Sequence, residues 1–138
     1  MMKHPYVRAY LGGIAVPTAF LLLVMSGYTF LRYAIDIPLP IERIIVFPMA
    51  VVPNLWGLWN VLYLAAFARR NVPLGIYGGI LPLLIAPLGY GVARILDFSI
   101  PAIVFNAFFP IAFPLTLILY YFAWKYFVGF LNRELSIA

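Results

Sequence analysis

Long apolar segments separated by short charged ones dominate the hydropathy pattern of this chain. Four segments lack Asp, Glu, Lys and Arg, and each is long enough to cross a bilayer as a helix: 10–31, 44–67, 72–93 and 100–124. A helix of about 22 residues is roughly 33 Å long, against a hydrocarbon core of about 30 Å. Because lipid offers no partner for unpaired backbone groups, helices are predicted and not strands. We expect an all-α integral membrane protein, a four-transmembrane-helix bundle in one domain, 1–138.

Proline occurs inside every predicted span, so kinked helices are expected. An internal proline removes one backbone hydrogen bond, which membrane helices tolerate where neighbouring groups satisfy the freed carbonyl. The second and third spans share the pattern PxxxxPxx[WY]G, which occurs as Pro48, Pro53, Trp56, Gly57 and as Pro82, Pro87, Tyr90, Gly91. Since consecutive spans run in opposite directions, the match is either an inverted repeat of the kind found around transporter sites or a chance coincidence.

The segment after the fourth span, 125–138, has a mixed composition. Phe127 and Phe130 fall on one helical face, while Asn132 and Arg133 fall elsewhere. This segment is predicted either to extend the fourth helix or to form a cytoplasmic or interfacial tail lying along the membrane surface.

Composition supports membrane insertion. The chain is 66% hydrophobic and 9% charged, with a mean hydropathy of +1.05. Soluble domains are roughly half apolar and about a quarter charged, so neither a soluble nor a disordered chain fits. The absence of cysteine excludes disulfides and thiolate metal sites.

Basic residues are distributed unequally between the two sides of the predicted bundle. With four spans, the termini and the second connection share a side, which holds six of the nine Lys and Arg residues: Lys3, Arg8, Arg69, Arg70, Lys125 and Arg133. The positive-inside rule then places both termini in the cytoplasm, in a multi-pass protein of the cytoplasmic (inner) membrane. The formal charge of +5 falls on that side, which favours contact with anionic lipid and not with nucleic acid.

Polar and aromatic residues on the second, third and fourth spans form one candidate ligand site. Its members carry amide, hydroxyl or aromatic groups: Trp56, Asn60, Tyr63, Tyr90, Asn106 and Thr116. Amides on facing helices can line a cavity for a neutral or aromatic ligand. Alternatively, Asn60 and Asn106 hydrogen-bond across the bundle, and tyrosines such as Tyr63 belong to the interfacial belt.

Two further groups of residues have a structural and a functional interpretation. Opposite charges concentrate at the outer face: Arg32, Asp36, Glu42, Arg43, Arg94 and Asp97. They either bind a lipid phosphate or small polar ligand, or fasten the first loop to the bundle through pairs three or four residues apart. Small residues on the third span recur at helical spacing: Gly75, Gly79, Ala86 and Gly89. They predict close helix packing, within the chain or across a homodimer.

The residue inventory excludes several mechanisms within the spans. Ion-coupled transport needs an ionisable residue there, and no span contains Asp, Glu, Lys or Arg. The single histidine, His4, does not suffice for haem or a metal, so no cofactor is expected. Serine and threonine in the spans have no nearby acid or histidine to activate them.

Two functions remain. The first is a non-enzymatic structural or accessory protein, either a subunit of a larger membrane complex or a homo-oligomer. The alternative is a channel or facilitator for a small neutral or apolar molecule, with its site between the second, third and fourth helices. Enzyme chemistry remains conceivable at the outer rim, where Asp36, Glu42 and Asp97 lie, but no motif favours it.

Overall fold

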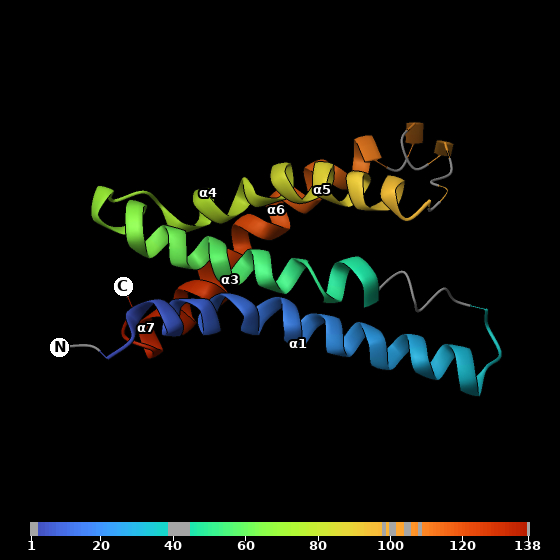
Figure 1. Ribbon diagram of the computed structural model, residues 1–138, viewed down its shortest axis with the longest axis horizontal. Coiled ribbons are helices and arrows are strands. Elements are labelled where there is room, and N and C mark those ends of the chain that lie inside the picture. The colour runs from blue at the N-terminus through green and yellow to red at the C-terminus, as the bar shows by residue number, and fades with distance from the viewer. Residues whose placement is uncertain are drawn as a thin grey trace.

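The structure is a computed structural model that describes residues 3–38, 45–97, 99, 102–103, 106–107 and 109–137. The secondary structure of these residues is helical, as the sequence predicted. Four helices are long and apolar enough to cross a membrane: Pro5–Ala34, Phe47–Arg70, Leu74–Ile95 and Phe109–Glu134. They lie roughly lengthwise beside one another (Figure 1).

The first long helix is regular, whereas the other three are built from shorter pieces. The first is α1 (Pro5–Ala34). The second comprises η1 (Ile45–Met49), α3 (Val52–Leu62), η2 (Tyr63–Phe67) and η3 (Ala68–Arg70). The third comprises α4 (Leu74–Gly79) and α5 (Leu81–Ile95), and the fourth comprises α6 (Phe109–Phe122), η5 (Ala123–Val128) and α7 (Gly129–Glu134).

Two of the interruptions precede prolines. The second helix breaks at Ala50 and Val51, just before Pro53, and the third breaks at Ile80, just before Pro82. Each proline lies in the first turn of the piece that follows the break, where its missing N–H costs no hydrogen bond to the preceding piece. The wide turns η1, η2 and η5 are π-helical and alter the direction in which later side chains point.

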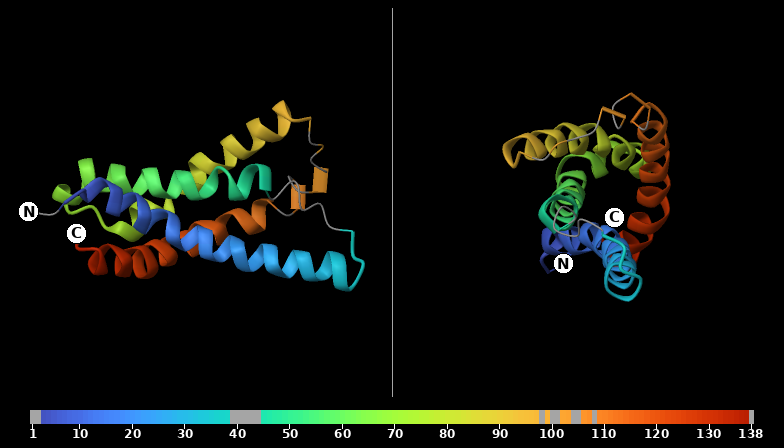
Figure 2. Two further views of the ribbon diagram at one scale, coloured as in Figure 1. Left: turned by 60° about the horizontal axis from the view of Figure 1, so that its bottom comes forward. Right: turned by 90° about the vertical axis from the view of Figure 1, so that its right-hand side faces the viewer.

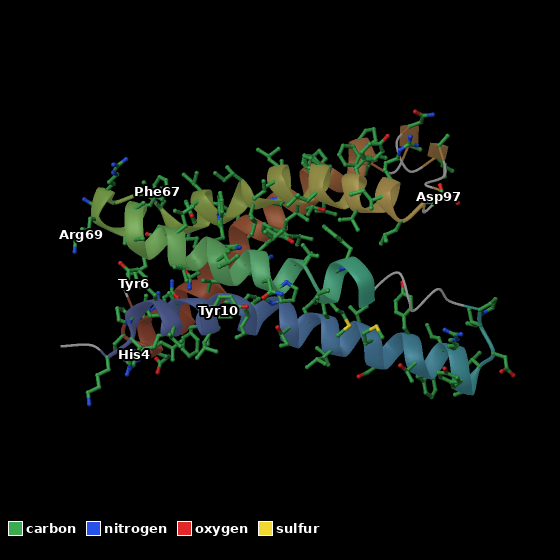
Figure 3. All side chains as sticks on the ribbon, in the orientation of Figure 1. His4, Tyr6, Tyr10, Phe67, Arg69 and Asp97 are labelled. Atoms are coloured by element: carbon green, nitrogen blue, oxygen red, sulfur yellow. The ribbon has the colours of Figure 1, made fainter. Side chains whose placement is uncertain are left out.

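Both termini lie at the same end of the molecule as the turn between η3 and α4 (Figure 1). Asn71 closes this turn in the left-handed conformation, with φ 54°, which asparagine tolerates better than most residues. The last residues of α1 and α5 lie at the opposite end. Figure 3 shows His4 and Arg69 at the first end and Asp97 at the other.

The helices pack closely near the termini. We call the residues 5–21, 56–82 and 120–137 the closed half of the bundle. Its core contains buried aromatic and aliphatic side chains: Trp56, Tyr77, Leu81, Trp124 and Val128. Further aromatic residues of the second and fourth helices pack against this core, so the closed half is filled largely by rings.

The pair α1 and α3 makes the most extensive contact in the closed half. A Cβ on Gly13 would lie 2.5 Å from the backbone oxygen of Trp56, and one on Gly57 would lie 2.5 Å from the ring of Tyr10. The two backbones therefore approach as closely as they do because glycine occupies both positions.

The helices diverge toward the other end. We call residues 22–34, 83–95 and 109–119 the open half, in which α5 leans away from the remaining helices (Figure 2). Large apolar side chains are exposed here, with Leu23 at 74% and Ile95 at 84% of full exposure. Such side chains are compatible with surrounding lipid or with another membrane protein.

The segment after residue 124 extends the fourth helix and does not begin a separate surface helix. The helix runs through η5 and α7 to Glu134. Phe127 and Phe130 point outward and are exposed, whereas Val128 and Asn132 are buried against the other helices. The inward face therefore carries a polar residue, because apolar side chains lose nothing by facing lipid and a polar amide gains by finding a partner.

Candidate functional site

The buried polar centre of the closed half is a pair of asparagine side chains. Asn60 of α3 is fully buried, and its Nδ2 donates to the Ala9 carbonyl at 2.7 Å and to Oδ1 of Asn132 at 2.8 Å. Asn132 of α7 returns a bond from its own Nδ2 to Oδ1 of Asn60 at 3.0 Å. Both Nδ2 protons of Asn60 have acceptors, so this amide joins three helices and presents no donor to a ligand.

Gly12 makes room for this pair. A Cβ at Gly12 would lie 3.2 Å from Oδ1 of Asn132 and 3.5 Å from Nδ2 of Asn60. These contacts place α1 directly against both amides. The amide pair and Gly12 therefore form one unit of packing, in which the small residue lets α1 cover the polar groups.

The predicted hydrogen bond between Asn60 and Asn106 does not form. Asn106 is exposed, and the partner of Asn60 is Asn132, which was not among the predicted site residues. The reason is geometric, because the carboxyl-terminal part of the fourth helix packs against α1 and brings Asn132 and Trp124 to α3. A search for amides at matching helical spacing could have found Asn132, since Trp124, Val128 and Asn132 lie four residues apart along one face.

The remaining candidate ligand residues lie apart from Asn60. Tyr90 is 48% exposed on α5. The hydroxyl of Thr116 donates to the Ala112 carbonyl of its own helix at 2.8 Å. Asn60 is buried in the closed half, whereas Asn106 is exposed. A ligand site formed by these residues therefore stays a prediction.

An aromatic cluster fills the space between the second, third and fourth helices of the closed half. Trp56 lies 5.2 Å from Trp124 between ring centroids, and Tyr77 lies 6.2 Å from Trp124. Trp59 stacks on Tyr77 at 4.9 Å, and each donates to the other's backbone carbonyl at 3.0 Å. Tyr63 also contacts Tyr77, and its hydroxyl donates to the Val72 carbonyl. Tyr63 is thus bonded within the bundle.

Two indole N–H groups in this cluster lack acceptors among the described residues, those of Trp56 and Trp124. Tyr120 lies beside Trp56, with ring centroids 4.9 Å apart. The ring faces are nevertheless well packed. The cluster therefore gains its stability from burial and ring contacts more than from polar bonds.

The small residues of the third helix meet the fourth helix of the same chain. A Cβ on Gly75 would lie 2.9 Å from the Tyr121 ring, and one on Gly79 would lie 3.4 Å from Cβ of Tyr121. Farther along, a Cβ on Gly89 would lie 3.2 Å from the Phe47 ring, and Ala86 is half-buried. Close packing by Gly75 and Gly79 is thus an intrachain feature.

The tightest position on this helix is Gly78, which was not among the predicted packing residues. A Cβ there would overlap the indole of Trp124. Gly78 is therefore the residue that admits the largest side chain of the core.

The charged residues predicted to pair at the outer end do not lie together on one helical turn. Asp36 and Asp97 lie beyond the ends of α1 and α5, and both adopt left-handed backbone conformations. In the part of the chain that the structure describes, no ion pair joins Arg94 to Asp97. Pairs three or four residues apart meet only while the helix continues, and both helices end first. Glu42 and Arg43 lie outside the described residues.

The two copies of the proline pattern have different surroundings. Trp56 is buried and Gly57 contacts α1, whereas Tyr90 is exposed and Gly91 has open space beside it. The helix breaks also occur at different places, before the second proline of one copy and before the first proline of the other. The shared pattern therefore does not produce two equivalent structural units.

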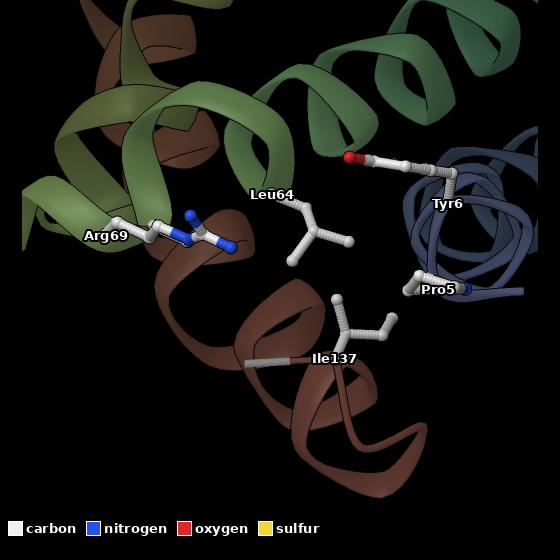
Figure 4. A pocket seen from close by; sticks show the side chains of 6 residues that line it. Pro5, Tyr6, Leu64, Arg69 and Ile137 are labelled. Atoms are coloured by element: carbon white, nitrogen blue, oxygen red, sulfur yellow. The ribbon is translucent and has the colours of Figure 1, made fainter. Parts of the chain in front are cut away.

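A pocket of about 500 Å³ opens at the end of the closed half that carries the termini (Figure 4). Three segments far apart in the sequence line it: Pro5, Tyr6, Leu64, Ala68, Arg69 and Ile137. Four of these side chains are apolar, one is a phenol and one is a guanidinium. The sequence pattern did not indicate this pocket, because no motif links the three segments.

Comparisons of the chain with protein-family models, with curated proteins and with solved structures found no match. We therefore infer function from the residues and their geometry alone.

Proposed function

We propose that this is a multi-pass protein of the inner membrane and a non-enzymatic accessory subunit, whose open half receives a transmembrane helix of a partner membrane protein. The observation that carries this proposal is the contrast between the two halves of the bundle. The closed half is held by its own amide pair and aromatic cluster. The open half exposes apolar and small residues along diverging helices.

Membrane insertion is supported by the surface of the four long helices. Large apolar side chains are exposed on each of them, for example Leu23, Leu58, Leu83 and Leu119. A soluble protein rarely exposes apolar surface on this scale. Lipid or a membrane partner is the environment in which such a surface is stable.

The orientation is supported by the arrangement of the ends. The termini and the turn that carries Arg69 and Arg70 lie together, with Arg94 at the opposite end (Figures 1 and 3). Most basic residues therefore belong to one end of the bundle, and the positive-inside rule assigns that end to the cytoplasm.

Glycines in the open half support helix docking as the role of that half. A Cβ on Gly27 of α1 or on Gly91 of α5 would meet nothing within 4 Å. Exposed small residues let a second helix approach closely, and van der Waals contact drives helix association in lipid. In the closed half, by contrast, rings and side chains of the same chain cover the glycines Gly12, Gly57 and Gly78.

Cysteine crosslinking tests this proposal cleanly because the chain has no native cysteine. We expect Gly27→Cys and Gly91→Cys, labelled with a short photocrosslinker in native membranes, to give an adduct with another protein. Leu58→Cys is the matched control, since Leu58 is exposed on the closed half. An adduct that forms equally from Leu58→Cys, or none from either glycine position, contradicts the proposal. An adduct of two copies of this chain indicates a self-associating bundle instead.

A further inference from the structure

The pocket at the terminal end combines one cationic group with apolar walls. Tyr6 of α1 and Arg69 of η3 are its polar members, and Leu64, Ala68 and Ile137 form much of the remaining lining (Figure 4). Arg69 is exposed and makes no ion pair or hydrogen bond among the described residues. A guanidinium presents several donors in a planar fork that matches the geometry of a phosphate.

Ile137, which forms part of the apolar lining, is held in place by the turn that follows α7. The Ile137 N–H donates to the Asn132 carbonyl at 2.8 Å, and the Ser136 N–H donates to the Arg133 carbonyl at 2.9 Å. These bonds fold the chain back after α7 and bury the Ile137 side chain. The apolar wall is thus an ordered part of the closed half.

A neighbouring arginine is already engaged in this turn. Nη1 of Arg8 donates to the Leu135 carbonyl at 3.3 Å and so satisfies one of the last carbonyls of the helix. Arg8 therefore has a structural partner. Arg69 is the arginine whose fork remains available to a ligand in the pocket.

Charge at this end attracts anions. Six basic residues belong to it: Lys3, Arg8, Arg69, Arg70, Lys125 and Arg133. Glu134 is the acid among the described residues there, and it does not line the pocket. If the span Phe47–Arg70 crosses the bilayer as proposed above, Arg69 lies at its end, at the level of the lipid head groups.

We propose that this pocket binds the head group of an anionic phospholipid. The Arg69 guanidinium pairs with the phosphate, the Tyr6 hydroxyl donates a hydrogen bond to it, and Leu64 and Ile137 contact the glycerol and the first methylenes. An apolar lining gives a soluble anion no added affinity, whereas it contacts the lipid directly. The inference rests on the proposed membrane location, but it needs no partner protein.

Lipid binding to the purified full-length protein in a neutral detergent tests the inference. We expect phosphatidylglycerol to bind more tightly than phosphatidylcholine of the same acyl chains, measured by native mass spectrometry and by the rise in Tm. Arg69→Gln weakens phosphatidylglycerol binding about tenfold, as expected for loss of a charge-assisted contact. Tyr6→Phe weakens it about threefold, as expected for loss of one neutral hydrogen bond.

Arg70→Gln is the matched control, since it removes the same charge from the neighbouring residue, which does not line the pocket. We expect its phosphatidylglycerol affinity to stay within about twofold of the parent, because exposed charges outside the site contribute little. Because Arg69 has no partner among the described residues, we expect Arg69→Gln to retain the lipid-free Tm of the parent.

Two results overturn the inference. Equal loss of affinity in Arg69→Gln and Arg70→Gln means that the lipid responds to overall charge and not to the pocket. Glycerol phosphate, which has the head-group charge but no acyl chain, is expected not to compete. Competition by glycerol phosphate at concentrations equal to the lipid identifies a soluble-anion site instead. Since this experiment contains no partner protein, its outcome is independent of the crosslinking test.

Discussion

At the scale of single residues, polar side chains decide which way the helices face. Asn60 and Asn132 lie 72 positions apart in sequence and exchange two hydrogen bonds, and Asn60 also bonds the Ala9 carbonyl. An amide without a partner is costly in an apolar interior, so each asparagine restricts the rotation of its helix. Residue type alone predicted that the Asn60 amide would form a hydrogen bond with another helix. The partner itself depended on where the fourth helix comes closest.

Removing one amide of this pair should destabilise the bundle. Asn60→Leu leaves the Asn132 amide unpaired and removes the bond to the Ala9 carbonyl, and we expect a loss of about 1 to 2 kcal/mol in the free energy of unfolding in detergent. Asn106→Leu is the control, since Asn106 is exposed, and its expected effect is below about 0.5 kcal/mol.

The double variant Asn60→Leu and Asn132→Leu should cost less than the sum of the two single variants, because neither change then leaves the other amide unpaired. Strictly additive losses, or an Asn106→Leu effect as large as that of Asn60→Leu, would contradict the importance of the pair.

At the scale of helices, glycines set how closely the elements approach. Gly13 and Gly57 bring α1 against α3, and Gly78 admits the Trp124 indole. The sequence indicated that the third helix packs closely, and Gly75 and Gly79 do contact Tyr121 of the fourth helix. Spacing in the sequence could not predict which glycine is most costly to substitute, however, because that cost depends on the size of the facing side chain.

Adjacent glycines of α4 provide a matched comparison. Gly78→Ala places a methyl group in the volume of Trp124, and we expect a loss of about 2 kcal/mol or more, or failure to fold. Gly79→Ala adds only ordinary contact at 3.4 Å to Tyr121, and we expect a change within about 0.5 kcal/mol.

Thermal unfolding in detergent, with size-exclusion chromatography to check folding, measures both variants. Equal effects at the two positions would show that the helices do not pack as described.

At the scale of the whole molecule, the bundle is asymmetric along its length. The closed half contains the amide pair, the aromatic cluster and the terminal pocket, whereas the helices of the open half diverge. This asymmetry coincides with the charge asymmetry, since the end with the termini is also the basic end. The proposed cytoplasmic end is therefore the closely packed end.

Two serines at opposite ends allow the proposed orientation to be tested. Ser136 and Ser99 are both exposed, and serine to cysteine is a conservative change. In intact cells, we expect a membrane-impermeant maleimide to label Ser99→Cys and to label Ser136→Cys only after permeabilisation. The cysteine-free parent chain provides the background. Labelling of Ser136→Cys in intact cells would reverse the orientation.

The sequence by itself determined the all-helical architecture, the number of long apolar helices and the approximate limits of the first three, whereas the fourth, predicted over 100–124, continues to Glu134. These follow from backbone hydrogen bonding and bilayer thickness, which act on each segment separately. The sequence also determined the charge bias that predicts orientation, because charges are confined to the ends of the helices.

The tertiary structure decided which faces point inward, and so the partner of Asn60, the position of Gly78 and the lining of the terminal pocket. In a soluble protein, hydrophobic periodicity would have indicated those faces. In this chain the outward-facing and core-facing sides of the helices are both largely apolar, so periodicity carries little directional information. Polar partners and steric fit between segments distant in sequence supply that direction instead, as when Asn132 turns inward while Phe127 and Phe130 face outward.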